Sequence, residues 1–144
     1  MKKILFLLLI LVSCQKTDIN KSINGTDWFA STEGSGSSEI YQNGEYIRSE
    51  YNIITDITLR FITESTGSVS TKSVATVDGV SEPPIRTDVD FTYTYDSDFM
   101  RGNIFYDLSV SPDLKNPLKS TFEIRSGFLY DDSELTGKVE YRRK

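Results

Sequence analysis

Few residues in this chain could carry out catalysis. Its 144 residues include no histidine and a single cysteine, Cys14. Without histidine, Ser-His-Asp and Cys-His catalytic arrangements and histidine-containing zinc sites are excluded. Carboxylates remain, because glycoside hydrolysis needs only two Asp or Glu side chains at a suitable separation. The sequence singles out no such pair, so we expect no catalytic residue and no enzyme.

Acidic residues beside expected turns are the candidates for a metal site. Asp96 and Asp98, together with Asp131, Asp132 and Glu134 at one rim, offer the hard oxygen ligands that calcium prefers. The full twelve-residue calcium-loop pattern is absent. A solvated acidic turn is the default interpretation, so we expect no metal and no cofactor.

Tyr41 and Tyr46 are the candidates for ligand binding. They flank Asn43-Gly44, a dipeptide suited to the positive φ angles of a type I′ turn. A two-residue turn there would place the tyrosines opposite each other at an exposed hairpin tip. Aromatic rings with a polar tip suit sugars, lipids and partner proteins. The alternative interpretation is a structural cross-strand pair.

The N-terminal residues indicate export and a lipid anchor. Lys2 and Lys3 precede an apolar run over residues 4–12, which is too short to span a membrane. Leu11-Val12-Ser13-Cys14 resembles the lipobox of bacterial lipoproteins. This resemblance implies removal of residues 1–13 and attachment of the protein to the membrane through a lipidated Cys14. An ordinary signal peptide with a stray cysteine is the alternative.

Residues 14–24 are mostly polar and are expected to form a flexible tether. Cys14-Gln15-Lys16-Thr17-Asp18 resembles the short signal that sends Bacteroidota-type lipoproteins across the outer membrane. We therefore expect an outer-membrane protein and favour the cell surface over the periplasmic face. The formal charge of −5 repels phosphate backbones, so no nucleic-acid partner is expected.

Alternation of apolar and polar residues, which is typical of strands, runs from about residue 25 to the end of the chain. It is clearest over residues 85–96, and it also places Phe122, Ile124, Phe128 and Tyr130 on one face. No stretch has a helical apolar stripe, and no crossover is long enough for a parallel sheet. We therefore predict one all-β domain over residues 25–144, an antiparallel up-and-down barrel of about eight strands. A β-sandwich is the alternative.

Several short motifs resemble the small lipocalin-like domains of Bacteroidota-type lipoproteins. They are Gly25-Thr26-Asp27-Trp28, Leu59-Arg60-Phe61 leading to Gly67, and Phe91-Thr92-Tyr93-Thr94-Tyr95 leading to Gly102-Asn103-Ile104. The resemblance covers about residues 24–144, implies a lipocalin-like barrel, and brings no catalytic signature.

The expected function is a non-enzymatic, outer-membrane-anchored binding domain for a small amphipathic ligand or a glycan. A small barrel can enclose such a ligand or be filled by its own side chains. The first alternative is a structural or inhibitory module that contacts another envelope protein. The second is a carboxylate-based glycan hydrolase.

Overall fold

The computed structural model describes residues 21–106, 118–133 and 137–144, and this part of the chain is all-β. Nine strands are present in it, namely β1 (Thr26–Gln42), β2 (Glu45–Phe61), β3 (Thr66–Val77), β4 (Val80–Ser81), β5 (Ile85–Asp96), β6 (Arg101–Tyr106), β7 (Leu118–Arg125), β8 (Phe128–Ser133) and β9 (Gly137–Arg143). Within these ranges, no helix is long and apolar enough to cross a membrane.

Eight of the strands close into an antiparallel barrel. Each pairs with its neighbour in the order β1-β2-β3-β5-β6-β7-β8-β9, and β9 returns to β1. The short strand β4 is an addition that pairs with the end of β3. The predicted up-and-down barrel is confirmed, and a closed ring of strands excludes the β-sandwich alternative.

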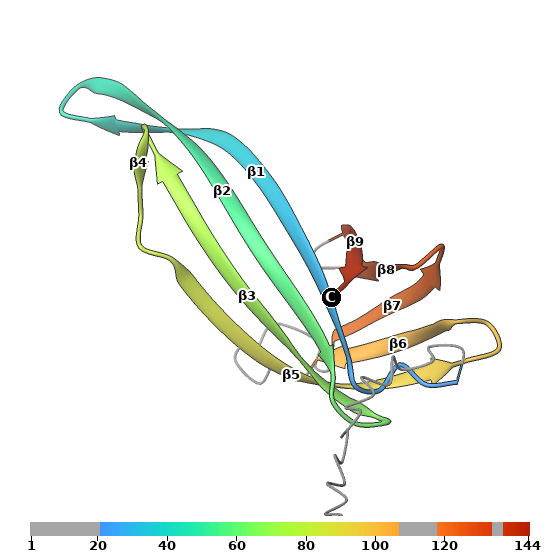
Figure 1. Ribbon diagram of the computed structural model, residues 1–144. Coiled ribbons are helices and arrows are strands. Elements are labelled where there is room, and N and C mark those ends of the chain that lie inside the picture. Colours follow the sequence, from blue (N-terminus) through green and yellow to red (C-terminus); the bar gives the residue numbers. More distant parts are fainter. Residues whose placement is uncertain (1–20, 107–117, 134–136) are drawn as a thin grey trace, which may run out of the picture.

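The barrel closes through a short contact between its first and last strands. Trp28 and Phe29 of β1 pair with Arg143 and Arg142 of β9. Beyond this contact, β1 leaves the barrel together with β2 and β3, as Figure 1 shows at its upper left. We call this extension the arm; it comprises residues 30–42, 45–57 and 70–77, strand β4 and the first residues of β5.

The lumen of the barrel is filled by its own side chains. Trp28, Phe61 and Leu129 are fully buried, and they belong to one continuous cluster of core residues. The Phe61 ring lies with its centroid 4.8 Å from that of Tyr93 and 5.5 Å from that of Phe122. Edge-on and tilted aromatic contacts of this kind stabilise a core beyond the burial of area alone. An eight-stranded barrel is just wide enough to be filled in this way.

The folded domain begins before its first strand. Ile23 is only 1% exposed and belongs to the same core cluster as Trp28. The Thr26 hydroxyl donates a hydrogen bond of 2.6 Å to the Ile23 carbonyl and accepts one of 2.9 Å from the Trp28 indole. The tether expected over residues 14–24 therefore ends by Ile23, because that side chain is part of the core. Residues 1–20 lie outside the described part of the chain.

One expected face assignment is wrong. Phe128 and Tyr130 do not share the inward face of Ile124, because a two-residue turn shifts the alternation. Ser126-Gly127 adopt φ angles of 53° and 83°, which a type I′ turn requires. Ile124 then pairs with Leu129, and paired residues share a face. Leu129 therefore enters the core, and Phe128 faces outward.

This register can be tested by truncating the two neighbouring side chains. We expect Leu129→Ala to lower the free energy of unfolding by about 2–5 kcal/mol, because it leaves a cavity in a packed core. Phe128→Ala removes a larger but only half-buried side chain, so its effect is expected to be smaller. Urea denaturation measures both values. A larger loss of unfolding free energy in Phe128→Ala than in Leu129→Ala would contradict the register.

Candidate functional site

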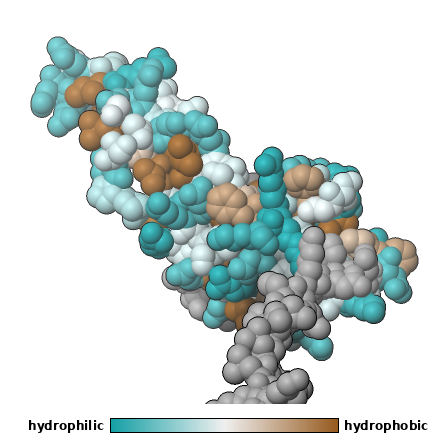
Figure 2. Space-filling model, viewed as in Figure 1, coloured by the Kyte–Doolittle hydropathy of each residue, from teal (hydrophilic) through white to brown (hydrophobic). Residues whose placement is uncertain are grey.

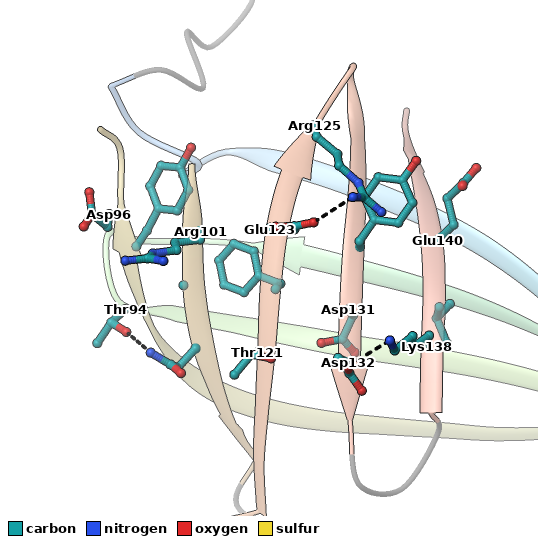
Figure 3. Close-up of a pocket in the computed structure, with 16 residues that line it drawn as sticks. Thr94, Asp96, Arg101, Thr121, Glu123, Arg125, Asp131, Asp132, Lys138 and Glu140 are labelled. Carbon is teal, nitrogen blue, oxygen red and sulfur yellow. Dashed lines mark hydrogen bonds and ion pairs between the residues drawn. The ribbon is translucent and has the colours of Figure 1, made fainter. Parts of the chain in front are cut away.

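An open hollow of about 840 Å³ lies over strands β5 to β9. We call it the polar hollow because charged residues make up half of its lining (Figure 3). The outward-facing charged residues that line the hollow are Asp96, Arg101, Glu123, Arg125, Asp132, Lys138 and Glu140.

Strand register brings these side chains together from distant parts of the sequence. Asp96 pairs with Arg101, Arg101 with Glu123, Glu123 with Tyr130, and Tyr130 with Glu140. Residues paired across antiparallel strands point to the same side of the sheet. The row therefore crosses five strands on the side opposite the packed lumen, and it alternates acidic, basic and aromatic groups.

Arg125, the last residue of β7, contacts two other residues that line the hollow. Its Nη1 is 3.3 Å from Glu123 Oε1, and its guanidinium lies 4.2 Å from the centroid of the Tyr130 ring. Lys138 Nζ forms a second ion pair, 3.8 Å from Asp132 Oδ2. Both ion pairs are exposed, so each contributes little to folding. Their donors and acceptors can therefore be redirected to a ligand at low cost.

Asp131 was expected at a rim turn, but the structure places it inside the barrel. Strand β8 continues to Ser133, and Asp131 points inward, two positions after Leu129. Its side chain is buried, the residue being 3% exposed, and Ser120 Oγ donates a hydrogen bond to it. In the sequence, Leu129, Asp131 and Ser133 occupy alternate positions, which places Asp131 on the inward face of Leu129. This pattern can be recognised only when the two-residue turn at Ser126-Gly127 is placed correctly.

Burial raises the pKa of Asp131 to about 6. The Ser120 hydrogen bond lowers this pKa, and the nearby charge of Asp132 raises it. Burial also raises the pKa of Tyr106 and of Tyr141, and the Asp131 charge adds to both shifts. Asp131 and the two tyrosines therefore form a polar group at the inner side of strands β6, β8 and β9.

Tyr41 and Tyr46 lie at the tip of the arm, as their sequence context predicts. They pair directly across the β1–β2 hairpin, with ring centroids 4.9 Å apart. Asn43 and Gly44 have φ angles of 55° and 89°, which confirms the expected turn geometry. The tyrosines are 66% and 76% exposed. They do not line the polar hollow, and a role in ligand binding stays a prediction.

Asp96 has a structural role in the β5–β6 turn. Its Oδ1 accepts hydrogen bonds from the backbone N–H groups of Asp98, at 3.1 Å, and of Phe99, at 3.3 Å. Among the residues that the structure describes, no three His, Cys, Asp or Glu side chains are grouped so that they could hold a metal ion. Glu134 and Cys14 lie outside the described ranges.

Neither a protein-family model, nor a curated protein, nor a solved structure matches this chain. A barrel fold alone does not define a function, because one fold hosts many unrelated sites. The features of this molecule that bear on function are therefore its packed lumen, its polar hollow and its arm.

The buried carboxyl of Asp131 predicts a specific dependence of stability on pH. Its pKa of about 6 lies above the ordinary value of 3.8, so the folded protein binds more protons than the unfolded chain between these pH values. The Asp131 carboxyl therefore contributes least to the stability of the folded protein above pH 6. We expect Asp131→Asn, which keeps an acceptor for Ser120, to gain up to about 3 kcal/mol relative to the unmodified protein between pH 4 and 7.5.

Urea denaturation at a series of pH values measures this gain. Asp132→Asn is the matched control, because this neighbour faces outward and its loss should leave most of the pH dependence in place. An Asp131→Asn variant with an unchanged pH profile would show that this carboxyl is not desolvated in the folded state.

Proposed function

We propose that this protein is a lipid-anchored, non-enzymatic binding module of the cell envelope that binds a glycan in the polar hollow. The observation that carries the proposal is the contrast between two surfaces of the same strands. The lumen is filled by core residues, whereas an open hollow over the same strands is lined by outward-facing charged groups and Tyr130, together with the inward-facing Tyr95, Phe122 and Val139. The closed antiparallel barrel agrees with the lipocalin-like fold that the sequence resemblance implies.

The chemistry of the lining favours a hydroxyl-rich ligand. Sugar hydroxyls both donate and accept hydrogen bonds, so they can bind carboxylates such as Glu123 and cations such as Arg125 or Lys138. Tyr130 offers an aromatic ring for the apolar face of a sugar. A small amphipathic ligand would need a largely apolar pocket. The packed lumen does not provide one, which is why we favour the glycan.

Oligosaccharide arrays followed by isothermal titration test this proposal. We expect Arg125→Ala and Tyr130→Ala each to weaken binding at least about tenfold, a loss of about 1.4 kcal/mol. Tyr46→Ala is the matched aromatic control and should bind normally, because Tyr46 lies at the arm tip. Absence of binding to any glycan would contradict the proposal. Turnover of a bound glycan would instead indicate the carboxylate hydrolase.

The anchor is tested separately. Several acyl chains on one residue hold a protein durably on a membrane, whereas one chain holds it only marginally. We expect Cys14→Ser to abolish incorporation of labelled palmitate and to release the protein from the membrane fraction. Protease treatment of intact cells then distinguishes the surface from the periplasmic face. Palmitate labelling that persists in Cys14→Ser would contradict the assignment of this cysteine.

A protein-interaction module is the second candidate function, and the arm is the feature that favours it. The arm extends away from the barrel and exposes apolar side chains, among them Ile40, Ile47 and Ile53. Such exposure marks an interaction surface when the side chains are contiguous.

A further inference from the structure

The two faces of the arm differ in how many charged residues they carry. Strand register assigns alternate residues to each face, because residues paired across strands point to the same side. The inner face continues the inward alternation of the barrel core from Ala30, Ile57 and Val69, and its charged member is Glu45, which pairs with Gln42 beside the turn at the arm tip. Within the arm its members are Ala30, Thr32, Gly34, Gly36, Ser38, Ile40, Gln42, Glu45, Ile47, Ser49, Tyr51, Ile53, Thr55, Ile57, Thr71, Ser73, Ala75, Val77, Ile85 and Thr87.

The outer face of the arm carries the charges and makes the polar contacts. Ser31 Oγ donates a hydrogen bond of 2.9 Å to Asp56 Oδ1, and Asn52 Nδ2 donates one of 2.8 Å to Glu33 Oε1. The other charged residues on this face are Glu39, Arg48, Glu50, Lys72, Arg86 and Asp88. The outer face is therefore suited to water, and the inner face to burial.

Large apolar side chains on the inner face are nevertheless exposed in a single chain. Ile53 is 37% exposed, and Ile40, Ile47 and Ile85 are more exposed still. Figure 2 shows hydrophobic side chains, in brown, at the surface along the arm. The small Ser38–Ser49 pair separates Ile40 and Ile47 from Ile53, and exposed apolar side chains gathered on one face in this way indicate a binding partner.

We propose that the inner face of the arm packs against the same face of a second copy of this chain. The whole chain has a formal charge of −5, so two copies repel each other in general. The inner face carries only Glu45, at its tip, which limits that repulsion, whereas an outer-face contact would bury acidic residues such as Glu33 and Asp56. The charge distribution therefore selects the inner face for self-association.

The shape of the inner face is also complementary to the same face of a second copy. Large residues of β2 lie beside small residues of β1, because Ile53 pairs with Gly34 and Tyr51 pairs with Gly36. The Tyr51 ring lies across Gly36, where a Cβ atom would come within 2.7 Å of the ring carbon Cζ. A Cβ atom at Gly34 would meet nothing within 4 Å. The space at Gly34 can therefore receive a projecting side chain from the partner, such as Ile53.

The area of the face approaches that of a dimer interface. At about 3.3 Å per residue and 4.8 Å per strand, the face is three strands wide from Ala30 to Gly36 and two strands wide from there to Ile40, which gives about 450 Å² of flat area. Two copies together would bury at least about 1,000 Å², because protruding side chains add to the flat area, and biological interfaces begin near this size.

The free edge of the arm is a less suitable contact. Within the described chain, residues 30–42 of β1 have β2 on one side and no strand on the other. Glu33 and Glu39 lie on this edge strand, and charges on edge strands discourage pairing with another chain. We therefore infer packing between faces rather than strand addition at the edge.

Cysteine cross-linking in the intact envelope tests the contact in the full chain. Ile53→Cys and Ile54→Cys are a matched pair, because these neighbours have similar exposure, 37% and 46%, and point to opposite faces. With a short bis-maleimide, we expect Ile53→Cys to give a product of twice the chain mass, and Ile54→Cys to give little. Equal yields for both variants would overturn the proposal. A product of Ile53→Cys with a different protein would overturn the second copy as the occupant.

Sedimentation of the purified full chain provides a second measurement. We expect Ile53→Glu to raise the dimer dissociation constant at least about tenfold, and Ile54→Glu to leave it nearly unchanged. Circular dichroism confirms that both variants are folded. A chain that is monomeric at high micromolar concentration, or that binds neutral phospholipid vesicles through Ile53 instead, would contradict the proposal. Neither result affects glycan binding in the polar hollow.

Discussion

The contact between β1 and β9 is the constraint on which the rest of the structure depends. It consists of two residue pairs, Trp28 with Arg143 and Phe29 with Arg142, and a hydrogen bond of 3.0 Å from the Lys144 N–H to the Asp27 carbonyl. Because closure uses only the beginning of β1, the remainder of that strand extends outside the barrel. The same contact places Trp28 in the core. Barrel closure, the burial of Trp28 in the lumen and the extension of the arm therefore all depend on the short β1–β9 contact.

Closure over a filled lumen leaves the outside of the molecule for the proposed recognition surfaces. Core side chains fill the barrel interior, and the buried polar residues among the described residues are Thr26, Ser120, Asp131 and Ser133. On the outside, two regions differ in chemistry: the polar hollow concentrates exposed ion pairs, and the inner face of the arm carries a charge only at its tip, on Glu45. A hydroxyl-rich ligand fits the former and an apolar surface fits the latter, so the two can be occupied independently.

Local pattern was enough to predict the fold class and the turn at the arm tip. Alternation over residues 85–96 identifies a strand, and Asn43-Gly44 identifies a type I′ turn, because both depend on neighbouring residues only. The inward position of Asp131 was missed because the turn at Ser126-Gly127 shifts the phase of β8. The arm was missed for another reason: alternation continues along β1 and β2 whether or not a second layer covers the strands. The polar hollow depends on the register of five strands, which no local signal provides.

Fluorescence of Trp28 tests the packed lumen most directly, because it is the single tryptophan of the chain and is fully buried in the core. A packed lumen predicts a blue-shifted Trp28 emission that iodide does not quench. Titration with fatty acids or other small amphipathic ligands should leave this emission unchanged. A saturable change in emission on adding such a ligand would contradict the account, because it would show that the barrel interior opens to receive it.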